Sequence, residues 1–160
     1  QKVMRWNSRV GLTRRLGTLS RRHREAVIQD VDIPLENAPA FLSFFQREIG
    51  IRPIWICPAR HDGRHGHYPL FPMRDDTLYI NFGFWDAVRT DSMHSQGHFN
   101  RMIEEKVTEL GRIKSLSSES VSPQKEFWEL YGGHNYRLLK DRYDPGHVLK
   151  DLYQKCVLRQ

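Results

Sequence analysis

Long apolar runs, cysteines and phosphate-binding loops are scarce or absent in this sequence. No stretch among its 160 residues approaches the roughly 20 consecutive apolar residues of a membrane-spanning helix. No apolar segment follows the basic N-terminus, so a secretory signal peptide is not expected in these residues. The two cysteines, Cys57 and Cys156, have neither the spacing of a metal site nor that of a disulfide scaffold. We therefore expect a protein of a reducing compartment, with a cytoplasmic location.

The sequence also lacks the motifs of common catalytic and nucleotide-binding sites. No GxGxxG follows a predicted strand, no GxxxxGK[ST] occurs, and neither a GxSxG elbow nor a credible Ser–His–Asp set is present. The pair Gly132-Gly133 falls between predicted helices, where glycine commonly ends a helix. If the protein serves redox chemistry, its cofactor is therefore expected to be held mainly by another part of the molecule.

Positive charge is concentrated at one end of the chain. The formal net charge is +6, but residues 1–24 hold eight basic residues and no acidic one. Residues 25–160 contain 17 basic and 19 acidic residues, which gives a net charge of −2. We expect no nucleic-acid partner, because phosphate binding needs a basic surface. The partly helical arm, residues 1–24, is interpreted either as a contact to an anionic membrane surface or as a connecting segment that packs on a neighbouring domain.

The apolar patterns predict one α+β domain over residues 25–160. Apolar residues near period two predict strands, and apolar residues at helical spacing predict helices. The order β-α-β-β-α-β predicts a ferredoxin-like antiparallel sheet with helices on one face, followed by C-terminal helices. The predicted strands are 27–34, 52–58, 77–84 and 113–117, the predicted helices of the sheet domain are 36–49 and 95–110, and the C-terminal helices are 124–131, 134–142 and 148–157.

The third predicted strand carries polar residues on one face. Alternate residues of a strand point to the same side, so Tyr79 and Asn81 share one face, and Leu78 and Ile80 take the other. A face with Tyr79 and Asn81 suits a planar ligand with polar edges, and the alternative is a cross-strand pair at a solvated surface. Either the C-terminal helices or a second domain must cover the face of the sheet that the helices leave open.

Histidines raise the alternative of a metal-binding protein. His61, His65 and His67 lie within seven residues, but the glycines between them favour a solvated loop. His94 and His98 have the i, i+4 spacing of zinc proteases, yet the glutamate that acts as general base in that motif is absent. We therefore expect no metal site.

Four segments carry a family resemblance when they are taken in order. They are Val27-Ile28-Gln29-Asp30 through Pro34, Arg52-Pro53-Ile54-Trp55-Ile56-Cys57-Pro58, Leu78-Tyr79-Ile80-Asn81-Phe82-Gly83, and Glu126-Phe127-Trp128-Glu129-Leu130-Tyr131-Gly132-Gly133, which leads to Tyr136 and Tyr143-Asp144-Pro145. Together they resemble the C-terminal part of flavin-dependent oxidoreductases of the vanillyl-alcohol oxidase family. The resemblance is to the branch of Δ24-sterol reductases, the plant Diminuto/Dwarf1 type and bacterial FAD-linked oxidases, and it covers residues 27–157.

The resemblance implies that the chain is one part of a larger FAD-dependent oxidoreductase. In this family an N-terminal domain binds FAD, while the C-terminal domain covers the isoalloxazine and shapes the substrate pocket. The chain begins at Gln1 instead of Met, so we expect its own N-terminal FAD-binding domain to be missing and the isolated chain to be inactive. The implied reaction is hydride transfer between flavin N5 and a lipophilic, sterol- or lipid-like substrate.

The resemblance also implies roles for individual residues of the sheet. Tyr79 and Lys114 are the predicted catalytic residues, as groups that stabilise the anionic reduced flavin. The predicted cofactor-binding residues are Gln29, Asp30, Asn81 and Ser118. Gln29, Asp30, Tyr79 and Asn81 are expected to face the flavin or the substrate. Close relatives carry a tyrosine near position 117, where this chain has Ser117, so a proton-transfer role is not expected there.

A stand-alone ferredoxin-like binding module is the main alternative to the flavoenzyme. Its basic arm would contact a membrane surface or RNA. Trp55, Tyr79, Phe82 and Trp85 are aromatic residues that can stack on bases, but the negative charge of residues 25–160 opposes RNA. A protein that binds metal through the histidines of the 61–67 loop is the third interpretation.

Overall fold

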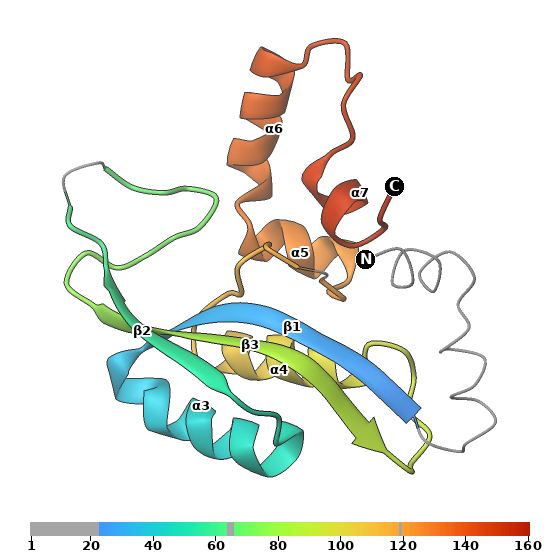
Figure 1. The fold of residues 1–160 in the computed structure, drawn as a ribbon. Coiled ribbons are helices and arrows are strands. Elements are labelled where there is room, and N and C mark those ends of the chain that lie inside the picture. Colours follow the sequence, from blue (N-terminus) through green and yellow to red (C-terminus); the bar gives the residue numbers. More distant parts are fainter. Residues whose placement is uncertain (1–22, 64–65, 119) are drawn as a thin grey trace, which may run out of the picture.

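The computed structural model describes residues 23–63, 66–118 and 120–160 (Figure 1). Residues 1–22, nearly all of the basic arm, lie outside the described residues. The two interpretations of the arm therefore stay predictions. The last two residues assigned to the arm, His23 and Arg24, belong to the first strand instead.

A three-stranded antiparallel sheet forms the centre of the described chain. The strands are β1 (His23–Pro34), β2 (Ile54–Arg60) and β3 (Leu78–Thr90), in the order β1-β3-β2. β1 pairs with β3 from His23 opposite Thr90 to Pro34 opposite Tyr79. Both strands are longer than their apolar alternation predicts, because backbone hydrogen bonds between them continue past the alternating segments. The α+β class is confirmed.

Two helical segments cover one face of this sheet, as predicted. The first begins with a 3-10 turn (η1, Leu35–Asn37), continues as α3 (Ala38–Phe44) and ends in a π-helical turn (η2, Phe45–Ile49). The second is α4 (His98–Glu109). The core between helices and sheet is apolar, and its members include Val27, Val31, Ile33, Phe41, Phe45, Phe82, Phe84, Phe99, Ile103 and Val107. Phe99, Ile103 and Val107 thus form the face of α4 that packs on the sheet.

The predicted fourth strand, 113–117, is wrong as a strand. It is reduced to one bridge between Val31 and Lys114, supported by a 2.9 Å hydrogen bond from the amide of Ser115 to the carbonyl of Asp30. The bridge is beside β1, where a split βαβ fold has its last strand. The ladder stops there because the following serines bond to side chains of β1 and α4 instead of continuing along the backbone of β1.

The C-terminal helices form a separate unit with its own small core. They are α5 (Gln124–Leu130), α6 (Gly133–Tyr143) and α7 (Leu152–Cys156), and all three are predicted within a few residues except the start of α7. Ile113, Phe127 and Tyr131 are buried among them. In Figure 1 these helices lie on the side of the sheet away from α3, and α6 projects outward.

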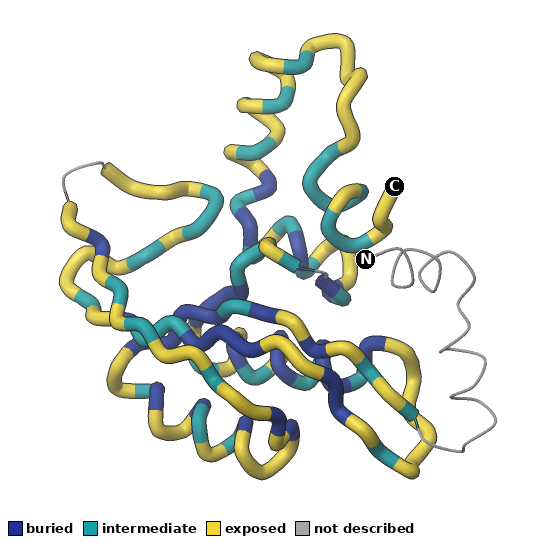
Figure 2. The backbone as a smooth tube through the Cα atoms, in the orientation of Figure 1, coloured by how far each residue is buried: buried dark blue, intermediate teal, exposed yellow. Residues whose placement is uncertain are grey.

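Burial follows this division into two units. Figure 2 shows buried residues concentrated in the sheet and its helices, and mostly exposed residues along α6 and the turn after it. Gly132 joins the C-terminal unit to the loop before β3, since a Cβ there would come within 2.2 Å of the carbonyl oxygen of Pro69. None of the helices in the described ranges has the length and apolar character that crossing a bilayer requires.

Candidate functional site

The face of the sheet opposite α3 and α4 is here called the outer face. Residues directly opposite each other in an antiparallel pair point to the same side, so the register assigns the residues to this face. The outer face consists of Ile28, Asp30 and Asp32 from β1, Trp55, Cys57 and Ala59 from β2, and Tyr79, Asn81, Gly83 and Trp85 from β3.

Three large apolar side chains of the outer face are open to solvent. Ile28, Trp55 and Trp85 are 53%, 57% and 56% exposed. Ile28 lies directly opposite Trp85, and Trp55 lies opposite Gly83, two residues away from Trp85 along β3. Cross-strand and diagonal neighbours of this kind are close enough to form one surface. The C-terminal helices do not cover this part of the face.

Gly83 forms the floor between the apolar side chains. A Cβ at this position would lie 2.8 Å from Oδ1 of Asp30 and 3.3 Å from Cβ of Trp55. Those two side chains therefore close over the space that a larger residue would need. The missing side chain of Gly83 is thus what lets Asp30 and Trp55 approach each other across β3.

Polar groups border the same floor. Oδ2 of Asp30 accepts a 3.0 Å hydrogen bond from the hydroxyl of Ser117, which comes from the segment after the bridge. Oδ1 of Asp32 accepts a 3.0 Å hydrogen bond from the amide of Asn81 on β3. Asn81 and Ser117 are side chains that can both donate and accept hydrogen bonds. The outer face thus offers apolar surface next to acceptors and donors.

The end of the outer face near Tyr79 is closed. Tyr79 is fully buried, and its hydroxyl accepts a 2.8 Å hydrogen bond from the backbone amide of Arg74. The guanidinium of Arg112 lies 4.5 Å from the centre of the Tyr79 ring and donates to the carbonyl oxygens of Asp32 and Pro72. Burial lowers the pKa of Arg112, and the group nevertheless stays charged because its ordinary pKa is so high.

Arg112 is a residue that the sequence interpretation missed. It follows the glycine that ends the α4 segment, and nothing in that local pattern indicates a buried cation. Only the folded chain brings it beneath the 66–76 loop, against Phe71 and Tyr79. Its guanidinium lies 4.5 Å from the centre of the Tyr79 ring.

Lys114 lies on the other side of the sheet. Its ammonium group is 3.5 Å from Oε1 of Glu104 on α4 and 3.4 Å from the hydroxyl of Ser118, and both Lys114 and Glu104 are buried. Gln29 also points toward the helices, where its amide donates a 2.8 Å hydrogen bond to Oδ1 of Asn100. Gln29 and Lys114 therefore do not face the outer face.

The six predicted site residues thus fall into two groups. Asp30, Tyr79 and Asn81 belong to the outer face, whereas Gln29, Lys114 and Ser118 belong to the helix side. The expectation that Gln29 and Asp30 face one ligand is corrected, because neighbours in a strand point to opposite sides. Tyr79 and Lys114 are likewise separated by the sheet. The roles assigned to these residues stay predictions.

Glu104 organises the polar cluster on the helix side. Its carboxylate accepts hydrogen bonds from the hydroxyl of Ser120 at 2.9 Å, from the hydroxyl of Ser122 at 2.8 Å and from the amide of Val121 at 3.1 Å. The end of the serine-rich stretch, residues 120–122, is therefore anchored to α4. Arg101 on the same helix reaches Glu126 of α5 at 2.8 Å, which attaches the C-terminal unit as well.

The histidines are placed as follows. The ring of His61 is buried, its Nδ1 lies 2.9 Å from Oδ1 of Asp75, and its edge meets Tyr68. His65 lies outside the described residues. The rings of His94 and His98 stack with their centres 4.2 Å apart. Within the described parts of the chain, no three metal-binding side chains come together.

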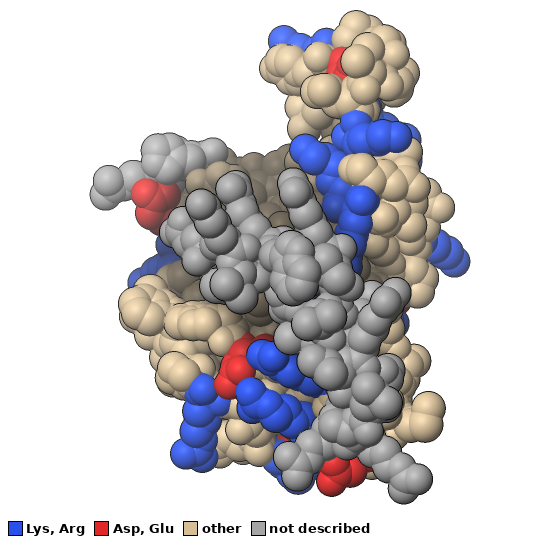
Figure 3. Space-filling view, turned by 45° about the vertical axis from the view of Figure 1, so that its right-hand side comes forward, with Lys and Arg blue, Asp and Glu red and all other residues tan. Residues whose placement is uncertain are grey.

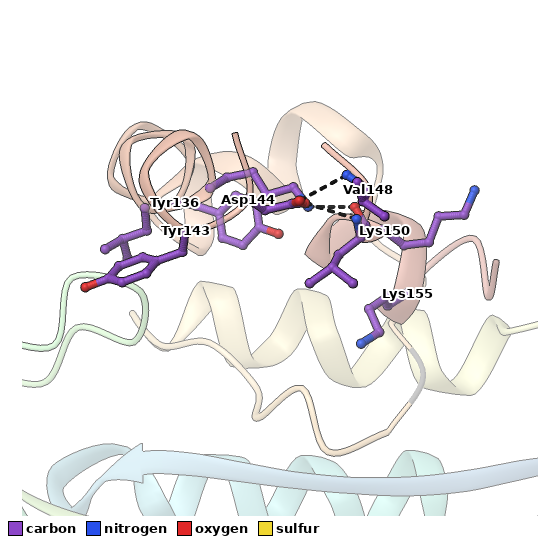
Figure 4. Close-up of a pocket in the computed structure, with 9 residues that line it drawn as sticks. Tyr136, Tyr143, Asp144, Val148, Lys150 and Lys155 are labelled. Atoms are coloured by element: carbon purple, nitrogen blue, oxygen red, sulfur yellow. Dashed lines mark hydrogen bonds and ion pairs between the residues drawn. The ribbon is translucent and has the colours of Figure 1, made fainter. Parts of the chain in front are cut away.

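A cleft of about 550 Å³ lies away from the sheet, between α6 and the segment that leads into α7 (Figure 4). Tyr136, Tyr143, Lys150 and Lys155 are among the residues that line it. The cleft does not include any of the predicted site residues.

Comparison with known proteins supports the family resemblance. No protein-family model matches the chain, and no solved structure matches it. The chain is 25% identical over 130 residues to the Delta(24)-sterol reductase of Homo sapiens and 24% identical over 134 residues to a Delta(24)-sterol reductase homolog of Caenorhabditis elegans. It is 23% identical over 149 residues to the Delta(24)-sterol reductase of Arabidopsis thaliana.

These matches cover most of this chain but a small part of the relatives. They include 81%, 82% and 83% of this chain, and 25%, 25% and 26% of the respective relatives. The chain thus spans about a quarter of the length of the curated relatives it matches. The predicted similarity to the Δ24-sterol reductases is confirmed.

Proposed function

We propose that this chain is the substrate-side domain of an FAD-dependent oxidoreductase that acts on a lipophilic, sterol- or lipid-like substrate. The exposed side chains of Ile28, Trp55 and Trp85 on the outer face carry this proposal. They form an apolar surface on a part of the sheet that none of the described helices covers. The similarity to Delta(24)-sterol reductases supports the same class of reaction.

The outer face fits the ring system of a flavin. The two tryptophans offer flat apolar surfaces, and the carboxylate of Asp30 lies next to them over Gly83. Asp30, Asn81 and Ser117 would bind the polar edge of the ring, which carries both an N–H group and carbonyl oxygens. A bound flavin supplies hydride transfer at N5.

The residues of this chain have the tasks of orienting ligands and excluding water. Trp55, Trp85 and Ile28 remove water from the apolar part of a substrate, which favours its binding by about 25 cal/mol for each Å² of apolar surface buried. Asp30 is held in place by Ser117, and Asn81 by Asp32, so their remaining hydrogen-bonding atoms have defined positions. Arg112 packs on the Tyr79 ring and donates to the carbonyl oxygens of Asp32 and Pro72, so it holds the closed end of the outer face in place.

We propose that a second domain of the same protein binds most of the FAD. The chain has no phosphate-binding loop, and it matches only about a quarter of each relative. The isolated chain is therefore expected to be colourless. A preparation of the chain that carries stoichiometric flavin would contradict this division between domains.

The test uses the protein that contains this chain together with its flavin-binding part. We expect the double variant Trp55→Ala, Trp85→Ala to retain its flavin and its thermal unfolding midpoint. It should lose at least about tenfold in the rate of hydride transfer between the flavin and the lipophilic substrate, since apolar contacts of this size contribute about 1.5–3 kcal/mol each. The control is Met93→Ala, because Met93 is 84% exposed and lies outside the outer face. Equal rates in the double variant and the control would refute the proposal.

A further inference from the structure

The turn between α6 and α7 is the most prominent apolar projection of the described chain. We call residues 143–150 the α6–α7 turn. Its side chains Tyr143, Val148 and Leu149 are 73%, 83% and 69% exposed. Figure 1 shows the turn at the far end of the projecting α6, away from the sheet. These residues therefore take no part in the core or in the outer face.

Internal hydrogen bonds satisfy several backbone groups of this turn. The carboxylate of Asp144 accepts 3.0 Å hydrogen bonds from the amides of both Val148 and Leu149, and it also binds the ammonium group of Lys140. Lys140 in turn donates to the carbonyl oxygen of Leu149 at 2.6 Å. Figure 4 shows these bonds converging on Asp144. The turn is closed around a polar centre, and Val148 and Leu149 are left on its outside.

This arrangement lowers the cost of moving the turn into an apolar medium. A backbone amide or carbonyl without a partner costs several kcal/mol in hydrocarbon, which usually keeps irregular segments out of it. Here the amides of Val148 and Leu149 and the carbonyl of Leu149 already have partners. Tyr143 adds an aromatic ring with a polar end, the type of side chain that favours a membrane–water interface.

Cations surround the apolar side chains. Arg142 lies beside the ring of Tyr143, and Lys150 and Lys155 line the cleft under the turn. None of these three forms an ion pair with a carboxylate in the described chain, whereas Asp144 is occupied by Lys140. Figure 3 shows several Lys and Arg side chains together on this part of the surface, where Asp and Glu are sparse.

The acidic groups near the turn do not cancel this charge. Asp141 lies 3.5 Å from His147, and Asp151 uses its carboxylate to cap the N-terminus of α7. Their charges are therefore directed at groups within the unit. The free cations are complementary to phosphate groups, and the apolar side chains between them are complementary to the acyl region below such groups.

We propose that the α6–α7 turn is a membrane-contact site that inserts Val148 and Leu149 into the interface of an anionic phospholipid bilayer. Tyr143 lies at the level of the head groups, and Arg142, Lys150 and Lys155 contact lipid phosphates. Three features occur together here: exposed apolar side chains, unpaired cations, and backbone groups at Val148 and Leu149 that already have hydrogen-bond partners. A bilayer surface uses all three. Such a contact brings the protein to the phase where a lipophilic molecule resides.

A fluorescent label tests insertion of this turn directly. The native cysteines are first removed from the full chain by Cys57→Ser and Cys156→Ser, so that a dye reacts at one position only. An environment-sensitive dye is then attached at Val148→Cys. The control carries the dye at Met93→Cys, another strongly exposed apolar position. We expect a blue shift of the label at 148, and none at 93, when vesicles of phosphatidylcholine and phosphatidylserine are added. An unchanged spectrum at 148 would overturn the proposal even if the chain sediments with vesicles, because residues 1–22 also carry cations.

Affinity measurements provide an independent readout. The double variant Val148→Asp, Leu149→Asp should bind the same vesicles on the order of tenfold more weakly, because two exposed apolar side chains no longer leave water. Lys150→Gln should weaken binding about fivefold, and added salt should remove this difference. Met93→Asp should bind like the unaltered chain. Equal binding of all variants to the vesicles would overturn the proposal.

Discussion

Val27 and Ile28 are neighbours in β1, yet Val27 is fully buried and Ile28 is 53% exposed. The same contrast separates Phe84 and Trp85 in β3, which are 0% and 56% exposed. The first member of each pair points to α3 and α4, and the second to the outer face. Both faces of this sheet therefore carry large apolar side chains, but in the described chain those at Ile28, Trp55 and Trp85 on the outer face stay open to solvent.

This difference suggests different tasks for the two faces: the helix side stabilises the fold, and the outer face is available for binding. On the helix side, apolar residues interlock, and the buried charges of Glu104 and Lys114 lie close to each other. On the outer face, Ile28, Trp55 and Trp85 lie around Gly83, and each is more than half exposed. A patch of exposed large apolar residues with a polar border usually marks an interaction site.

The largest expected effect compares two adjacent residues of β3. Phe84→Ala should lower the free energy of unfolding by about 3–5 kcal/mol, because it leaves a cavity in the core between β3 and the ring of Phe45. Trp85→Ala should lower it by less than about 1 kcal/mol, because that side chain is already largely in water. Urea denaturation of both variants measures the difference. Similar losses would show that the outer face also contributes to the core.

A second comparison uses adjacent glutamates of α4. Glu104→Ala should destabilise the protein by about 3 kcal/mol or more, because it leaves the ammonium of Lys114 and the hydroxyls of Ser120 and Ser122 without their buried partner. Glu105→Ala removes an exposed pair with Arg101 and should cost at most about 0.5 kcal/mol. Thermal and urea unfolding provide the values. If Glu104→Ala were as mild as Glu105→Ala, the serine segment would not depend on this carboxylate.

The smallest expected effect is local and depends on pH. The hydrogen bond from Lys140, together with those from the amides of Val148 and Leu149, holds the pKa of Asp144 below its ordinary value. A carboxyl group with a lowered folded-state pKa stabilises the fold above its unfolded pKa, about 3.9, and this contribution is lost as the pH falls through the folded-state pKa. Protection of the amides of Val148 and Leu149 from hydrogen exchange should therefore decrease below about pH 4.

The variant Asp144→Asn is the control for this pH dependence. It retains the size of the side chain but not its charge, so the two amides should be weakly protected at every pH. An acid-induced loss of protection in the variant that equals the loss in the unaltered chain would assign the effect to another group.

Much of the fold could be predicted from local patterns. The helical spacing of Phe41, Phe45, Ile103 and Val107 correctly indicated which sides of the two helices pack on the sheet. The alternation in β3 correctly separated Tyr79 and Asn81 from the residues that face the helices. Patterns of this kind repeat within a few residues, so they are visible without knowledge of distant segments.

The candidate site was only partly predictable. Asp30, Tyr79 and Asn81 do belong to the outer face. That Trp55 and Trp85 are exposed together is visible only in the structure, where none of the described helices covers them. Which residues surround a position depends on strand register and on distant loops, and a local pattern contains neither. Lys114 illustrates this limit, because its partner Glu104 comes from another element.

The sequence by itself determined the α+β class, the helix-facing sides and the similarity to sterol reductases, because each depends on residue types at short or fixed spacing. Only the tertiary structure decided that Gln29 and Lys114 are buried on the helix side, that Arg112 packs on Tyr79, and that the fourth strand shrinks to a bridge. These outcomes depend on contacts between residues that are far apart in the sequence. A buried charge such as Lys114 needs a partner, and only folding places Glu104 beside it.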